Sequence, residues 1–180
     1  MKILAIIFAL SLLAATPLAA QEGSRNNRAG LWGGFGFGMG SISCSDCSER
    51  SSDISGTAYI GGTVSPSVQL GASTHVYTEE QGGARLDGGA LVFSARLHPS
   101  EGDFFILLGA GLANFDAEIS VGSFSVSDSE QGGAGVIGIG YDIPISSSGK
   151  LALTPFGNWI VTSVGDTIEF FQFGLGLTWN

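Results

Sequence analysis

Large apolar residues alternate with small or polar residues along most of the chain after residue 30. Side chains of a β-strand point in turn to its two faces, so this period of two predicts strands with one apolar face. The alternation is clearest at the C-terminal end of the sequence. There one face carries Phe171, Phe173, Leu175, Leu177 and Trp179, and the other carries Gln172, Gly174, Gly176 and Thr178.

The same alternation marks eight segments of about ten to thirteen residues each. This length is close to the roughly 9–11 residues that a tilted transmembrane strand needs. The segments run from about Gly30 to Ser43, Ile54 to Ser65, Val68 to Thr78, Leu86 to Leu97, Phe104 to Phe115, Gly132 to Ile143, Leu151 to Val161 and Phe170 to Asn180. The seventh is the least regular, because Pro155 has no N–H to donate to a neighbouring strand.

The connections between these segments alternate in character. Three are compact and contain proline, at residues 65–67, 98–103 and 144–149. The others are on average longer and more polar, at residues 43–53, 79–85, 115–131 and 162–167. Short turns on one side and longer loops on the other are typical of outer-membrane barrels. An even number of strands then leaves both termini in the periplasm, with the longer loops outside the cell.

The pattern predicts an all-β fold, an eight-stranded antiparallel up-and-down transmembrane β-barrel. No apolar run after residue 20 is long enough to span a membrane as a helix, and a closed barrel is the other structure that pairs every backbone group in lipid. A soluble barrel of lipocalin type is the alternative, with its apolar face inside. The glycine-rich face suits a narrow interior, and the opposite face has almost no charge, which favours lipid outside.

Residues 1–20 have the features of a cleaved signal peptide. Lys2 supplies the positive start, residues 3–13 form a short apolar stretch, and Leu18-Ala19-Ala20 precede the expected cleavage. A transmembrane anchor is the alternative, but the apolar stretch is shorter than the roughly 20 residues that a spanning helix needs. We therefore expect a signal peptide at 1–20, a flexible periplasmic lead-in at 21–29 and the barrel at 30–180.

Charge excludes one class of partner. The chain has a formal net charge of −9, and charged residues make up 13% of it. Without a basic patch it has no electrostatic footprint for nucleic acid. The partners expected instead are outer-membrane lipid and, at the outer loops 43–53 and 115–131, an extracellular molecule.

The chain resembles the small eight-stranded outer-membrane barrels of the OmpA/OmpX type. The resemblance rests on the signal peptide, on the glycine-rich segment from Leu31 to Gly38, and on the closing alternation from Phe171 to Trp179. It implies the barrel architecture and a cell outer-membrane location. It also implies that the C-terminal strand is read by the barrel-assembly machinery, although Asn180 follows the aromatic residue that ends this strand in the family.

Cys44 and Cys47 form the one cysteine motif. Export to an oxidising compartment favours a disulfide that closes a very small loop. A redox-active pair would need basic neighbours, whereas Asp46 and Glu49 are acidic. A zinc site would need two further ligands, so we expect neither a metal nor another cofactor.

Ser73 and His75 lie two residues apart on one face, with Glu79 and Glu80 close behind. A nucleophilic hydrolase needs such a hydroxyl, base and carboxylate, and barrel enzymes that modify lipid A exist, which makes His75 a candidate base. Alternate strand residues are about 6.5 Å apart, too far for a hydrogen bond unless the rotamers favour it. An ordinary polar interior explains both residues equally well.

The polar residues expected inside the barrel are Gln69, His75, Arg96, Asn158 and Gln172. A buried Arg96 needs a partner, and Asp87 or Asp142 could pair with it. Eight strands leave an interior that side chains fill, which favours a polar plug over an ion pathway. The sequence therefore predicts a non-enzymatic barrel with a structural or cell-surface interaction role. A small porin, a lipid A-modifying enzyme and a soluble ligand-binding barrel are the alternatives.

Overall fold

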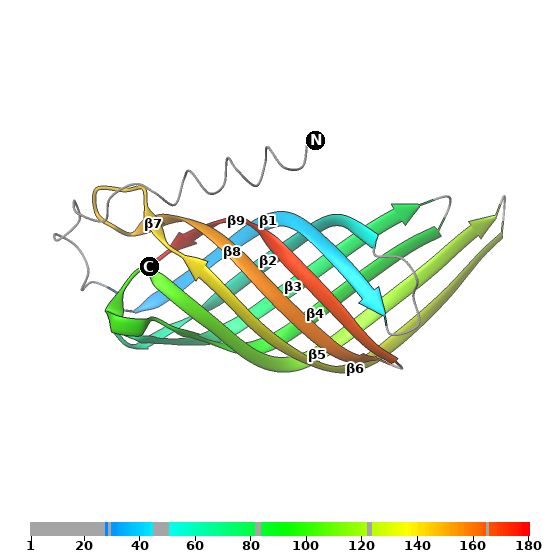
Figure 1. Ribbon diagram of the computed structural model, residues 1–180, viewed down its shortest axis with the longest axis horizontal. Helices are drawn as coiled ribbons and strands as arrows, with labels where there is room; N and C mark the ends of the chain where they lie inside the picture. Colours follow the sequence, from blue (N-terminus) through cyan, green and yellow to red (C-terminus); the bar gives the residue numbers. More distant parts are fainter. Residues whose placement is uncertain (1–27, 29, 45–50, 82–83, 122–123, 165) are drawn as a thin grey trace.

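A computed structural model describes residues 28, 30–44, 51–81, 84–121, 124–164 and 166–180 (Figure 1). None of these residues belongs to a helix that is long and apolar enough to cross a membrane. The strands are β1 (Leu31–Cys44), β2 (Ser51–Ser65), β3 (Val68–Gln81), β4 (Ala84–Leu97), β5 (Phe104–Val121), β6 (Phe124–Tyr141), β7 (Ile143–Pro144), β8 (Leu151–Val164) and β9 (Asp166–Trp179). A short 3₁₀ turn, Pro99–Glu101, connects β4 to β5.

Antiparallel pairing between neighbours in sequence closes the strands into a barrel. The chain runs in order from β1 to β6, β6 pairs with β8, and β9 pairs with β1 (Figure 1). The two-residue β7 continues β6 in the same register along β8, after an interruption opposite Pro155. Proline lacks the N–H that the ladder needs, so β6 and β7 form one strand with a local break. The predicted eight-stranded up-and-down barrel is confirmed.

The outer surface carries an apolar belt around the barrel. Its exposed members include Phe35, Phe37, Ile60, Leu91, Phe93, Leu108, Leu112, Ile137, Ile139, Trp159, Phe171, Phe173, Leu175 and Trp179. The interior carries most of the buried polar side chains, among them Gln69, His75, Arg96, Asn158 and Gln172. A lipocalin-type barrel would have the opposite arrangement. The apolar face of each strand therefore faces outward, as a membrane-spanning barrel requires.

Glycine pairs allow a close approach where the barrel closes. Gly38 on β1 lies opposite Gly174 on β9, and Gly36 lies opposite Gly176. A Cβ atom on Gly38 would lie 1.9 Å from the carbonyl oxygen of Phe173, and one on Gly174 would lie 2.3 Å from that of Phe37. The glycines of the first and last strands therefore permit the β1–β9 seam that completes the barrel.

Two hairpins are longer than the sequence pattern predicted. Residues 115–131 were assigned to an outer loop whose evenly spaced Ile119, Val121, Phe124 and Val126 suggest an extension of the two strands, and β5 does continue to Val121 and β6 begins at Phe124. In the same way β3 continues to Gln81 and β4 begins at Ala84. Figure 1 shows both hairpins projecting past the other strand ends. The β5–β6 extension follows from the alternation of apolar residues, which continues through residues 119–126.

Candidate functional site: the lumen and the projecting hairpins

Gln172 holds together the polar groups in the middle of the lumen. Its amide nitrogen donates to the carbonyl oxygen of Gly56 at 2.8 Å, and its amide oxygen accepts from the amide nitrogen of Asn158 at 3.1 Å. The same oxygen lies 3.1 Å from Nδ1 of His75. Gln172 on β9 thus connects β2, β3 and β8 across the interior.

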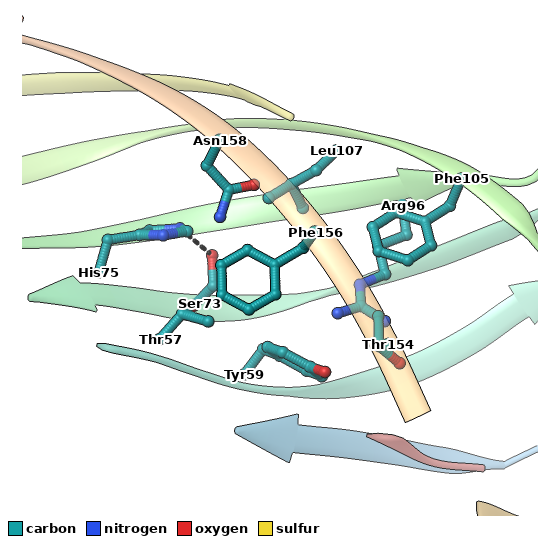
Figure 2. Close-up of a pocket in the computed structure, with 10 residues that line it drawn as sticks. All are labelled: Thr57, Tyr59, Ser73, His75, Arg96, Phe105, Leu107, Thr154, Phe156 and Asn158. Carbon is teal, nitrogen blue, oxygen red and sulfur yellow. Dashed lines mark hydrogen bonds between the residues drawn. The ribbon is translucent and has the colours of Figure 1, made fainter. Parts of the chain in front are cut away.

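These contacts also determine which ring nitrogen of His75 carries the proton. Because Gln172 presents an oxygen to Nδ1, the imidazole carries its proton on Nδ1, and Nε2 accepts from the Ser73 hydroxyl at 3.3 Å. The expected 6.5 Å separation is bridged because the two side chains turn toward each other (Figure 2). The third partner is an amide, however, which cannot stabilise an imidazolium as the carboxylate of a catalytic triad does.

Arg96 is only 3% exposed and lies in a cage of three aromatic rings. Its Cζ atom lies 3.9 Å from the ring centre of Tyr59, 4.3 Å from that of Phe105 and 4.6 Å from that of Trp32. The two carboxylates suggested for Arg96 do not form ion pairs with it. Asp87 pairs instead with Arg85 on the outer face of β4, and Asp142 accepts from Thr154.

Side chains fill most of the lumen. Ten residues, including Ser73, His75, Arg96 and Asn158, surround a cavity of about 10 Å³ (Figure 2). This volume is about what one water molecule needs.

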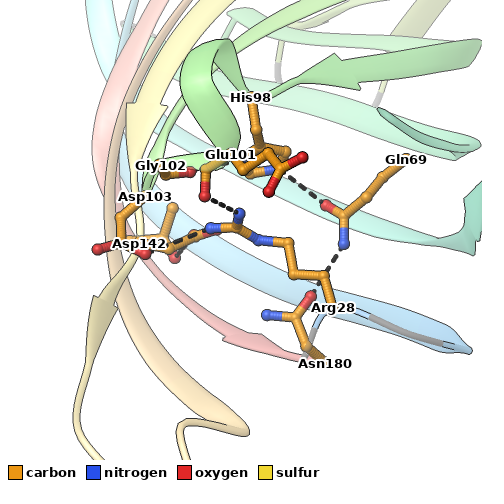
Figure 3. Close-up of polar contacts among 9 residues, drawn as sticks. Arg28, Gln69, His98, Glu101, Gly102, Asp103, Asp142 and Asn180 are labelled. Carbon is orange, nitrogen blue, oxygen red and sulfur yellow. Dashed lines mark hydrogen bonds and ion pairs between the residues drawn. The ribbon is translucent and has the colours of Figure 1, made fainter. Parts of the chain in front are cut away.

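A second polar network caps the periplasmic end, where Figure 3 shows Gln69, His98 and Asn180 together. The Gln69 amide nitrogen donates to the side-chain oxygen of Asn180 at 3.0 Å, and its oxygen lies 3.1 Å from Nε2 of His98. The backbone N–H of Asn180 donates to the carbonyl of Lys150 at 3.0 Å. Asn180, which the sequence pattern left unexplained, thus joins the C-terminal end of β9 to the interior and to the β7–β8 turn.

His98 lies between β4 and the 3₁₀ turn, at the end of the membrane-spanning strands. Burial, reinforced by the positive charge of Arg28, lowers the pKa of His98 to about 4. Its Nδ1 faces the carbonyl oxygen of Gly102 at 3.2 Å. Arg28 closes the same end by pairing with Asp103 at 3.3 Å. A pKa of about 4 leaves the ring neutral at neutral pH, so it can donate a hydrogen bond to only one of these two oxygens, that of Gly102 or that of Gln69.

The projecting hairpins are acidic, and the hairpin of β5 and β6 has an unpaired edge. β6 pairs with β8 only from Gly133 onward, so from Phe124 to Gly132 the described strands leave one edge of β6 free. The acidic side chains here are Glu79, Glu80, Asp87, Asp116, Glu118, Asp128 and Glu130. In the part of these hairpins that the structure describes, Arg85 is the one basic residue, and Asp87 already binds it at 2.7 Å.

The structure also places the remaining residues that the sequence predicted to be important. Gln69 belongs to the periplasmic cap, whereas His75, Arg96, Asn158 and Gln172 line the lumen. The proposed assembly residues Phe171, Phe173, Leu175, Leu177 and Trp179 occupy the outward face of β9. The expected Cys44–Cys47 disulfide lies outside the described residues, because Cys47 is not among them. The part of loop 43–53 at residues 45–50 is outside them as well.

The aromatic cage was missed by sequence reasoning, although a signal for it was present. Trp32 falls on the glycine face of β1 and Tyr59 on the threonine face of β2, which the period of two assigns to the interior. These large rings share the inward face with Arg96, which is the signal for the cation–π contacts that the structure shows.

Comparison with known proteins supports the fold. No protein-family model and no curated protein sequence matches the chain. Among solved structures, neisserial surface protein A matches with a TM-score of 0.61 at 13% identity, covering 84% of this chain and 97% of that one. The attachment invasion locus protein Ail of Yersinia pestis matches with a TM-score of 0.60 at 9% identity, covering 84% and 99%.

The N-terminal barrel domain of Pseudomonas aeruginosa OprF also matches, with a TM-score of 0.52 at 10% identity and coverages of 84% and 98%. The chain has the fold of a small outer-membrane β-barrel. Identities this low establish the fold alone, so the role of the protein rests on its own residues.

Proposed function

We propose that the protein is a non-enzymatic barrel of the outer membrane whose projecting hairpins contact a partner at the cell surface. The observation that carries the proposal is the β5–β6 hairpin, which continues as regular paired strands from Asp116–Ser129 to Val121–Phe124. A barrel that served only as a membrane anchor would not need this extension. Ordered loops positioned on a rigid scaffold are where binding residues concentrate.

The charge of the hairpins indicates the kind of partner. Asp116, Glu118, Asp128 and Glu130 lie on β5 and β6 and are exposed to solvent. Complementary potential attracts partners and like charge repels them, so a cationic surface fits these hairpins. Ail has been crystallised with the heparin analogue sucrose octasulfate. A polysulfate is poorly matched to the acidic hairpins of this chain.

The test compares two probes on protein held in nanodiscs. We expect immobilised polylysine to bind and heparin not to bind, with polylysine binding weakening as salt screens the charges. The quadruple variant Asp116→Asn, Glu118→Gln, Asp128→Asn and Glu130→Gln should lose most of this binding. Glu101→Gln, at the other end of the barrel, is the control and should keep it. Heparin binding stronger than polylysine binding would refute the assignment.

The lumen supports the absence of catalysis and of a pore. Ser73 is buried beside a cavity with room for about one water molecule, so a lipid cannot reach it. We expect no change in lipid A mass on expression, and no difference between wild type and His75→Ala. Discrete conductance steps in planar bilayers would show that the protein is a channel.

A further inference from the structure

A groove crosses the outer wall of the barrel beside the projecting hairpins. It has a volume of about 520 Å³ and spans β3, β4, β5 and β6. This volume is within the roughly 300–1,000 Å³ that is typical of small-ligand sites. Two rows of residues, aligned by the strand register, form its outward lining: Val76, Gly89, Asn114 and Gln131 in one row, and Leu91 and Leu112 in the next.

Glycine gives this groove its depth. Gly89 leaves a gap in the outer wall between Val76 and Asn114. In the next row Leu91 and Leu112 stand out from the wall, 64% and 72% exposed. A Cβ atom at Gly89 would lie 3.3 Å from the side-chain oxygen of Asn114, which can move. The position therefore accepts a larger residue, and that residue would fill the groove.

The groove lies where the apolar belt meets the charged hairpins. Leu91 and Leu112 belong to the belt, whereas the row on the other side of the groove carries Asp87 and Asp116. Because the hairpins project outside the cell, this boundary lies at the outer surface of the membrane, where the acyl chains of lipids meet their polar parts. One end of the groove therefore faces acyl chains, and the other faces the polar parts of the same lipids.

Asn114 gives the groove a polar group whose orientation is set by its neighbour. Its amide nitrogen donates to Asp116 Oδ2 at 3.1 Å, because an ionised carboxylate can only accept. The amide oxygen therefore lies over Gly89, where it can accept a hydrogen bond from a molecule in the groove. Lipid tails are as apolar as leucine, so close packing and hydrogen bonds, rather than the hydrophobic effect, decide what binds to such a surface.

We propose that this groove binds one acyl chain of an N-acylated lipid of the outer leaflet. The chain packs against Leu91 and Leu112 and over Gly89, and the amide N–H of the lipid donates to the side-chain oxygen of Asn114. An ester-linked phospholipid fits the apolar part equally well but has no donor at its linkage. The bilayer supplies the ligand, since the groove opens on the belt that faces lipid.

Two lipids with the same phosphocholine headgroup test the role of the amide. Sphingomyelin is N-acylated, whereas phosphatidylcholine is ester-linked. Folded protein in detergent is mixed with equal amounts of the two, and the lipids that remain bound are identified by native mass spectrometry. We expect one bound lipid and a preference for sphingomyelin of about threefold, the effect of one hydrogen bond inside a membrane. Sphingomyelin also has a hydroxyl, so its O-methyl ether, which keeps the amide, should be preferred to the same degree.

Two variants separate the chain from the amide. Gly89→Leu fills the groove and should remove the bound lipid, whereas Asn114→Ala should keep one lipid but lose the preference. Gly62→Leu is the matched control and should bind as wild type does, because a Cβ atom at Gly62, on the outer wall of β2, would point into open space. Lipid binding that survives Gly89→Leu, or equal binding of the two lipids to wild type, would overturn the proposal. A dimer that Gly89→Leu dissociates would show that a second copy of the chain covers the groove instead.

Folding of each variant is checked by the heat-dependent shift in gel mobility. If Gly89→Leu does not fold, the unmodified protein is photo-crosslinked to sphingomyelin that carries a diazirine in its acyl chain. The label should concentrate on the peptides that contain Leu91 and Leu112. Label spread evenly around the apolar belt would show that the groove holds no chain.

Discussion

Replacing Gln172 by alanine tests the polar network that holds the lumen together. Gln172 is fully buried and makes three hydrogen bonds, to Gly56, His75 and Asn158. Alanine removes all three and leaves an imidazole N–H and an amide N–H without partners, whereas Gly56 stays in the ladders with β1 and β3. Each lost bond contributes about 1 kcal/mol net, and each buried group left unsatisfied costs about 1–3 kcal/mol.

Partial relaxation of the neighbours reduces this sum, so we expect the free energy of unfolding to fall by roughly 3–5 kcal/mol. Asn158→Ala removes one of the three bonds and should cost roughly 1–2 kcal/mol. Because the two residues share a hydrogen bond, the loss of unfolding free energy in the double variant should be smaller than the sum of the two single losses by about 1 kcal/mol.

The assay is reversible urea unfolding in lipid vesicles, followed by tryptophan fluorescence and by gel mobility without heating. Gln131→Ala, at an exposed position on β6, is the matched control and should change stability by no more than about 0.5 kcal/mol. A loss below about 1 kcal/mol for Gln172→Ala would show that the network does not stabilise the fold.

Three further substitutions test other parts of the barrel. Gly38→Val should prevent closure of the β1–β9 seam, because even its Cβ would lie 1.9 Å from a backbone oxygen, and the protein should fail to show a heat-dependent gel shift. The pKa of about 4 for His98 lies below its unfolded value of about 6.5, so stability is full above pH 6.5 and falls between pH 6.5 and 4, by at most about 3 kcal/mol. In urea unfolding at pH 7.5 and pH 5, His98→Gln should have a smaller pH dependence than wild type, and an unchanged one would refute this. Asn180→Ala should lower the unfolding free energy by about 1 kcal/mol through loss of the Gln69 bond, and no change would show that the cap does not depend on it.

The sequence predicted the barrel well because the signal for it is spread over every strand. Each outward residue from Phe35 to Trp179 contributes to one period of two, so errors at single positions such as Pro155 do not change the result. The burial of Arg96 could be predicted by the same periodicity. Its surroundings could not, since Phe105 on β5 meets Trp32 and Tyr59, on the neighbouring strands β1 and β2, only when the barrel closes around the lumen.

The periplasmic cap and the extended hairpins are two further features that the sequence alone could not predict. Asn180 meets Gln69 across 111 positions of sequence, and no local pattern encodes such a contact. The hairpin of β5 and β6 has the alternation of a strand, but its serine- and glycine-rich composition equally suits a loop. Pairing with β4 resolves that ambiguity, because Ala84 to Leu97 support β5 as far as Ile119.

The central claim is that the apolar face of each strand contacts lipid while the polar face lines the lumen. It is tested most directly with single-tryptophan variants in vesicles of lipids brominated on their acyl chains. Trp159, 43% exposed on the outside of β8, should be strongly quenched, whereas Trp32, 1% exposed inside β1, should not. Quenching of Trp32 with Trp159 unaffected, or quenching of neither, would contradict the account.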